Sequence, residues 1–179
     1  MDALIVDVYV TWLSWAIKQE WCKNLTPILT SGCPAVRGTT YVSDVDINVL
    51  VTRELLERLL HIFEDEGLRP KSHFDKGWIT VTFVGYDLEV NVRFTVNKDQ
   101  LVRTLTHRHN EALLAVTYPK LAEKVAELKL NPDGTKRMST EPAWAEVLQF
   151  TGSKDDAYEY MNGPLDQLLE AAKKVNSLN

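Results

Sequence analysis

Two stretches in the first half of the chain carry apolar residues at helical spacing. Residues 4–23 form the first stretch, and its three tryptophans have the spacing of a core stripe, so we interpret them as packing residues rather than as a base-stacking platform. Residues 52–67 place five apolar side chains on one face, with Thr52 as the expected N-cap and Gly67 just past the last turn. These two patterns predict two amphipathic helices.

Three further stretches alternate between apolar and polar residues, which is typical of strands. They are residues 44–51, 78–83 and 87–92, and Gly85 lies between the last two, where a hairpin turn needs a permissive backbone. Because side chains alternate across a strand, Glu89 belongs to the face opposite the apolar residues. The third predicted strand therefore has one acidic face.

From residue 97 onward the pattern is helical. The expected helix boundaries are Asn97, Pro119, the turn at residues 131–134, Thr140, Ser153 and Pro164. The sequence thus predicts an α+β fold: a mixed β-sheet flanked by helices in residues 1–96, which include the N-terminal helix, and a helical C-terminal region in residues 97–179. We expect the second part to pack on the first as one compact unit.

Composition and charge narrow the function classes. Of the 179 residues 45% are apolar, which predicts a soluble globular chain and excludes disordered and fibrous classes. A net charge of -5 provides no global positive field for a nucleic-acid duplex or an anionic membrane. The apolar run at residues 8–17 is too short to span a bilayer, so no membrane association is expected. Cys22 and Cys33 are too few for a disulfide scaffold, which favours a reducing, cytoplasmic location.

Two aspartates two positions apart begin the first predicted strand. Asp44 and Asp46 should project from one face of it, and such a pair repels itself unless a cation lies between the carboxylates. Mg²⁺ usually binds through one or two carboxylates together with substrate phosphates. Glu89, on a later strand, is the expected third carboxylate, and Asp87 is the alternative. The turn at Gly32 would present backbone N–H groups to the phosphates of a nucleotide.

Residues 28–94 resemble the DNA polymerase β-like nucleotidyltransferase superfamily, in its small bacterial form. The signature of that family is a Gly-Ser pair at a helix start, then two acids separated by one apolar residue, then a third acid on a later strand. Gly32, Asp44 and Asp46 match it, and Glu89 stands where the third acid is expected. Cys33 replaces the serine of the family, and its thiol is a weaker hydrogen-bond donor than a hydroxyl.

The resemblance implies a nucleotidyltransferase-like sheet and an enzyme. It would move a nucleoside monophosphate from a nucleoside triphosphate to an acceptor hydroxyl, with release of pyrophosphate, using two Mg²⁺ ions held by Asp44, Asp46 and Glu89. The residues expected to contact the triphosphate are Gly32, Cys33, Arg37, Thr39, Ser43 and Arg93.

The sequence leaves open the identity of the acceptor and two alternatives to an enzymatic function. A small molecule, a protein side chain or an RNA end would each serve as acceptor, and the short chain favours a compact acceptor or a homodimer that shares the site. The alternatives are a non-catalytic, antitoxin-like binding protein and a nucleotide sensor without turnover. His107 and His109 lie two apart on a predicted helix and so point to different sides, which predicts a surface or capping role rather than a metal site.

Overall fold

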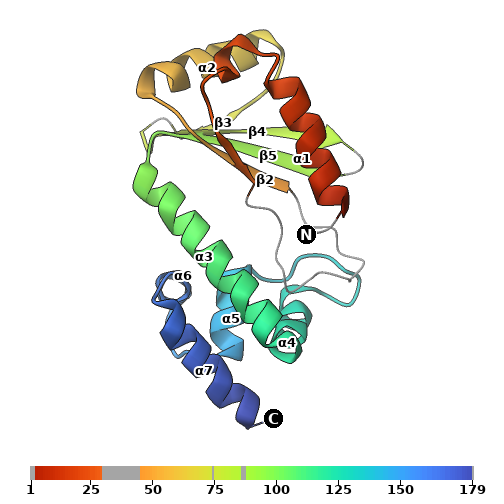
Figure 1. Ribbon diagram of the computed structural model, residues 1–179, viewed down its shortest axis with the longest axis vertical. Helices are drawn as coiled ribbons and strands as arrows, with labels where there is room; N and C mark the ends of the chain where they lie inside the picture. The colour runs from red at the N-terminus through yellow and green to blue at the C-terminus, as the bar shows by residue number, and fades with distance from the viewer. Residues whose placement is uncertain (1–2, 30–44, 74, 86–87, 179) are drawn as a thin grey trace. The chain divides into compact units, whose positions relative to one another are not determined.

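The chain forms two compact units that divide between residues 102 and 103. The computed structural model describes residues 3–29, 45–73, 75–85 and 88–178 (Figure 1). The division falls within helix α3 (Lys98–Thr117), so the start of this helix belongs to the first unit and the remainder to the second.

The first unit is built on a five-stranded mixed sheet. Its strands, in the spatial order β1-β2-β5-β4-β3, are Pro27–Leu29, Val45–Leu50, Leu88–Thr95, Trp78–Gly85 and Lys71–His73. β2 and β5 pair in parallel, whereas the other three neighbouring pairs are antiparallel. The parallel pair joins strands far apart in sequence, and the connection between them contains both α2 (Arg53–Asp65) and the hairpin strand β4.

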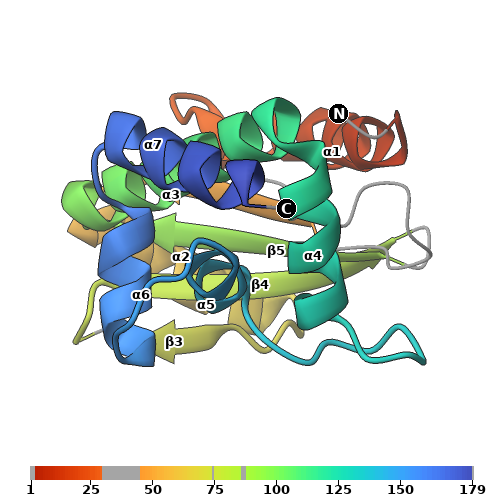
Figure 2. The same ribbon diagram turned by 90° about the horizontal axis from the view of Figure 1, so that it is seen from below.

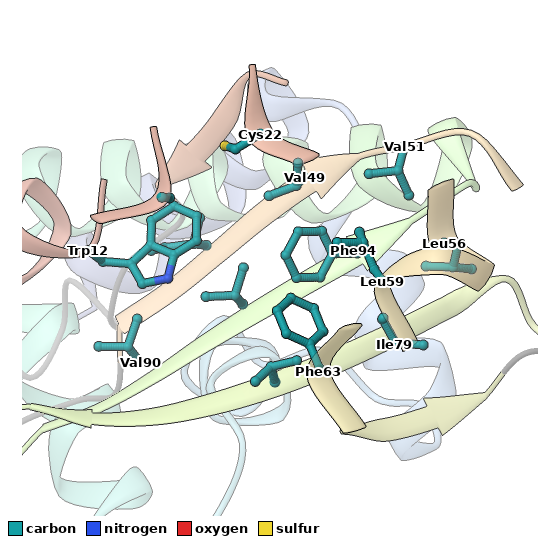
Figure 3. Close-up of a cluster of buried hydrophobic side chains, with 14 of the residues drawn as sticks. Trp12, Cys22, Val49, Val51, Leu56, Leu59, Phe63, Ile79, Val90 and Phe94 are labelled. Carbon is teal, nitrogen blue, oxygen red and sulfur yellow. The ribbon is translucent and has the colours of Figure 1, made fainter. Parts of the chain in front are cut away.

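One face of this sheet carries the hydrophobic core. Helices α1 (Ala3–Ala16) and α2 cover that face, as Figure 1 shows. Phe63 of α2 and Phe94 of β5 lie next to each other between helix and sheet, with ring centroids 5.5 Å apart (Figure 3). A short 3-10 helix, η1 (Glu20–Cys22), adds Trp21, whose ring packs edge-on against both phenylalanines. The tryptophans are packing residues, as expected.

Helix α2 begins and ends where its sequence predicts. The Thr52 hydroxyl accepts a hydrogen bond from the Leu55 amide at 3.2 Å, which satisfies one of the unpaired N–H groups of the first turn. Gly67 follows the last turn with a φ of +77°, a conformation that glycine adopts without steric cost. The amphipathic pattern, the N-cap and the terminating glycine are therefore all confirmed.

The second unit is helical among its described residues. After the remainder of α3 it contains α4 (Pro119–Lys129), α5 (Thr140–Val147), α6 (Lys154–Met161) and α7 (Leu165–Ser177). Figure 2 shows α5 nearly end-on, with α4 on one side and α6 on the other. Trp144 of α5 is fully buried in the core of this unit, and Ser153 starts α6 with a capping box to Asp156.

The predicted α+β class, the mixed sheet and the C-terminal helices are confirmed. Two details differ from the expectation. The first helix ends at Ala16, because a turn and η1 take up the rest of the predicted stretch, and the short strands β1 and β3 were not predicted. None of the helices in the described part of the chain is long and apolar enough to cross a membrane.

Candidate functional site

The sheet face opposite the core is polar, and we call it the sheet polar face. In β2 the residues Val45, Ile47 and Val49 are fully buried in the core, so the alternate positions Asp46 and Asn48 belong to the other face. The same alternation holds in β4 and β5. The sheet polar face comprises Asp46, Asn48, Thr80, Thr82, Glu89, Asn91 and Arg93.

The register of the parallel pair places Asp46 beside the polar residues of β5 on this face. Asp46 is the pairing partner of Asn91, and Glu89 lies two residues before Asn91 on the same strand. Asp46 and Glu89 are therefore diagonal neighbours on adjacent strands, which lie about 4.8 Å apart in a sheet. Asp46 is partly buried and Glu89 is exposed, while Thr82 donates a hydrogen bond to Asn91 Oδ1 at 2.8 Å. The face thus combines two carboxylates with a hydrogen-bonded amide beside them.

Arg93 provides the positive charge of the sheet polar face. Its guanidinium carbon lies 4.9 Å from the ring centroid of Trp78, a cation–π contact that fixes the side chain. Thr80 pairs with Arg93 in the register of β4 and β5. The hydroxyl oxygen of Thr80 is buried and has no hydrogen-bond partner among the residues that the structure describes. A buried hydroxyl without a partner is costly, which marks this position as a candidate ligand contact.

The structure describes three of the predicted site residues. Asp46, Glu89 and Arg93 are described, and all three belong to one face of one sheet, as the alternation predicts. The other predicted site residues lie outside the described residues: Gly32, Cys33, Arg37, Thr39, Ser43, Asp44 and the alternative acid Asp87. The roles assigned to all of these residues stay predictions.

A second group of ionisable side chains lies within the helical unit, and we call it the α3–α5 polar cluster. His107 and Glu111, one turn apart on α3, meet Glu141 from the first turn of α5. One ligand atom from each residue lies within 4.8 Å of the others, and His107 Nε2 is 3.1 Å from Glu141 Oε1. Glu111 is fully buried, and the other two side chains are each 12% exposed.

Two cationic side chains border this cluster. Arg108 Nη1 lies 3.0 Å from Glu111 Oε2, and Lys129 Nζ donates to Thr140 Oγ1 at 2.8 Å. Burial raises the pKa of Glu111 to about 7, an effect that the charge of Arg108 partly opposes and that of Glu141 reinforces. Burial and the charge of Arg108 lower the pKa of His107 to about 4, although Glu141 acts in the opposite direction. At neutral pH the imidazole is therefore uncharged.

The surface or capping role expected for His107 is wrong. Its side chain is buried against Glu141, because the spacing of His107 and Glu111 puts both on one helical face and α5 packs over them. His109, by contrast, is exposed as expected. The spacing of four between His107 and Glu111 was a signal available in the sequence, whereas the approach of Glu141 depends on tertiary packing.

The chain thus has an α+β fold, and its candidate site lies on the polar face of a mixed sheet. No protein-family model and no curated protein matches the sequence. Among solved structures, the crystal structure of conserved protein GrpB from Enterococcus faecalis is similar, with a TM-score of 0.49 and 20% sequence identity over 97% of this chain and 95% of that one.

The resemblance to the DNA polymerase β-like nucleotidyltransferase superfamily is therefore corrected. A solved structure that is similar over nearly the whole length is that of GrpB, not of a DNA polymerase β-like nucleotidyltransferase, and the predicted membership is wrong. The physical reason is the shortness of the motif. Two acids separated by one apolar residue share a face in any strand with a buried side, so the pattern of Asp44 and Asp46 is not specific to one family.

Proposed function

We propose that this chain is an enzyme that transfers a nucleoside monophosphate from a nucleoside triphosphate to an acceptor hydroxyl, in the presence of Mg²⁺, and releases pyrophosphate. The observation that carries the proposal is the parallel pairing of β2 with β5, which puts Asp46 and Glu89 on one face of adjacent strands. Carboxylate oxygens are the ligands that Mg²⁺ prefers, and the donor set of this face fits that ion. The proposal rests on these residues and not on a family.

Three described residues of the face have a role in this reaction. Asp46 and Glu89 would hold Mg²⁺, together with Asp44 outside the described residues, and the ion supplies charge neutralisation at the phosphates. Arg93 uses the plane of its guanidinium against Trp78, so the N–H groups at the edge of that plane suit a phosphate oxygen. Glu89 would also orient the acceptor hydroxyl, whose oxygen would bond to the α-phosphorus as the bond to pyrophosphate breaks and the hydroxyl proton passes to solvent.

The acceptor class follows from charge and size. A net charge of -5 disfavours a long nucleic acid, so we propose a small molecule, a protein side chain or an RNA end as the acceptor. In a homodimer, residues of the second copy would enlarge the small acceptor site. The scarcity of cysteine favours a reducing cytoplasm as the place of the reaction.

Thermal unfolding with nucleotides tests this proposal. Each of the four ribonucleoside triphosphates is added with Mg²⁺ or with a chelator, and Mg²⁺ alone serves as the control. A ligand that binds only the folded chain stabilises it by about 2.7 kcal/mol at a hundred times its dissociation constant. We expect one or more nucleotides to raise the midpoint only when Mg²⁺ is present.

The other outcomes separate the alternatives. A metal-dependent shift without transfer to any acceptor favours a nucleotide sensor. The absence of a shift with all four nucleotides contradicts the proposal and favours a non-catalytic, antitoxin-like binding protein.

A further inference from the structure

We propose that His107, Glu111 and Glu141 bind one divalent transition-metal ion, such as Zn²⁺, within the helical unit. All three residues belong to that unit, so the inference depends on neither the sheet polar face nor the proposed reaction. One imidazole and two carboxylates form a donor set that suits Zn²⁺ or Mn²⁺ better than Mg²⁺, which prefers oxygen alone.

The hydrogen bonding of His107 presents its Nε2 lone pair to the cluster. The ring donates to the backbone carbonyl of Arg103, one turn earlier on α3, and Nδ1 is the nitrogen left for that bond because Nε2 faces Glu141. Nε2 has no hydrogen-bond partner in the described part of the chain, although Glu141 Oε1 is only 3.1 Å away. The lone pairs of His107 Nε2 and Glu141 Oε1 thus face each other and repel, and a cation bound by both atoms would remove this repulsion.

Glu111 contributes a second electron-pair donor that has no hydrogen-bond partner among the described residues. It is fully buried on α3, and its Oε1 has no hydrogen-bond partner within the described ranges. Arg108 bonds the other oxygen, Oε2, at 3.0 Å. Ligating carboxylates are commonly held in this way, with one oxygen on the metal and the other on a hydrogen-bond donor. The hydrogen bond from Arg108 therefore orients the carboxylate and leaves Oε1 as the oxygen that would bind the metal.

The distances allow an ion to bind with small side-chain movements. Zn²⁺ bonds nitrogen and oxygen ligands at about 2.1 Å, which places tetrahedral ligand atoms about 3.4 Å apart. The three ligand atoms lie within 4.8 Å of one another, and the pair from His107 and Glu141 is at 3.1 Å. Three protein ligands on two helices also leave a fourth position for water or another ligand, the pattern of reactive rather than purely structural zinc sites.

Calorimetric titration of the full chain with Zn²⁺ alone tests the site. We expect the wild-type chain to bind one equivalent, and His107→Asn to weaken binding by roughly tenfold or more. The matched control is His109→Asn, which removes an exposed imidazole from the same helix and should leave the affinity unchanged. Equal Zn²⁺ affinity in wild type and His107→Asn would overturn the proposal, as would the absence of binding to the wild-type chain.

Two further measurements keep the test decisive if His107→Asn does not fold. Glu111→Gln is expected to fold, because burial already favours the neutral form of this side chain, and it should lose Zn²⁺ affinity as well. X-ray absorption spectroscopy at the zinc edge, on the wild-type chain with bound Zn²⁺, should show one imidazole with oxygen ligands at about 2.0 Å. A spectrum without imidazole scattering would contradict the assignment of His107.

Discussion

Asp46→Asn is expected to abolish Mg²⁺-dependent nucleotide transfer while the fold stays intact. The substitution removes a proposed charged ligand from the sheet polar face, where Asp46 pairs with Asn91 and lies diagonal to Glu89. Metal ligation supplies several kcal/mol of charge stabilisation at the reacting phosphates, and a loss of about 4 kcal/mol corresponds to roughly a thousandfold in rate. The asparagine keeps the size of the side chain, so packing in β2 should not change.

The rate of pyrophosphate release measures this effect. The assay uses the nucleotide that thermal unfolding identifies, together with a panel of acceptors. The matched control is Asp99→Asn, which removes an exposed carboxylate in the first turn of α3 and should retain the wild-type rate. The unfolding midpoint of each variant checks the fold. A fully active Asp46→Asn protein would rule out the proposed role of Asp46.

Phe63→Ala is expected to lower the free energy of unfolding by about 3–5 kcal/mol. Phe63 is fully buried between α2 and the sheet, and its ring contacts Trp21 and Phe94 with centroids 5.7 and 5.5 Å away. Removing the ring deletes both aromatic contacts and leaves a cavity that close-packed neighbours cannot fill completely (Figure 3).

Urea denaturation of the full chain measures the change in the free energy of unfolding of the unit that contains the sheet. Ile17→Ala is the control, since this side chain is 61% exposed and its loss should cost no more than about 0.5 kcal/mol. Phe63→Leu, which retains apolar volume at the same position, should fall between the two. If Phe63→Ala were no more destabilising than Ile17→Ala, the core assigned to this unit would be wrong.

Local signals along the chain account for much of the fold. The cap at Thr52, the cap of Asn97 on the Gln100 amide, the first residue of α4 at Pro119 and the capping box at Ser153 all lie where their residue types predict. These features depend on neighbours in sequence, because a cap or a proline acts on its own turn. The alternation in β2 and β5 likewise identified the polar positions of both strands.

Features that depend on partners far away in sequence were missed. β1 and β3 have three residues each, too few for alternation to be visible. Pairing makes them strands: β1 pairs with the distant β2, whereas β3 pairs with the nearby β4. The parallel pairing of β2 with β5 and the approach of Glu141 to His107 are also tertiary. For the same reason Asp46 and Glu89 could be assigned to polar faces from sequence, but not to adjacent strands.

Paramagnetic NMR tests most directly whether the metal-bound nucleotide binds the sheet polar face. Mn²⁺ replaces Mg²⁺ in a ¹⁵N-labelled sample, and the His107→Asn variant is used so that the α3–α5 polar cluster does not compete for the ion. We predict that amide signals of β2 and β5 around Asp46 and Asn91 broaden when nucleotide and Mn²⁺ are both present. Unchanged signals in these two strands, with broadening elsewhere or nowhere, would contradict the account.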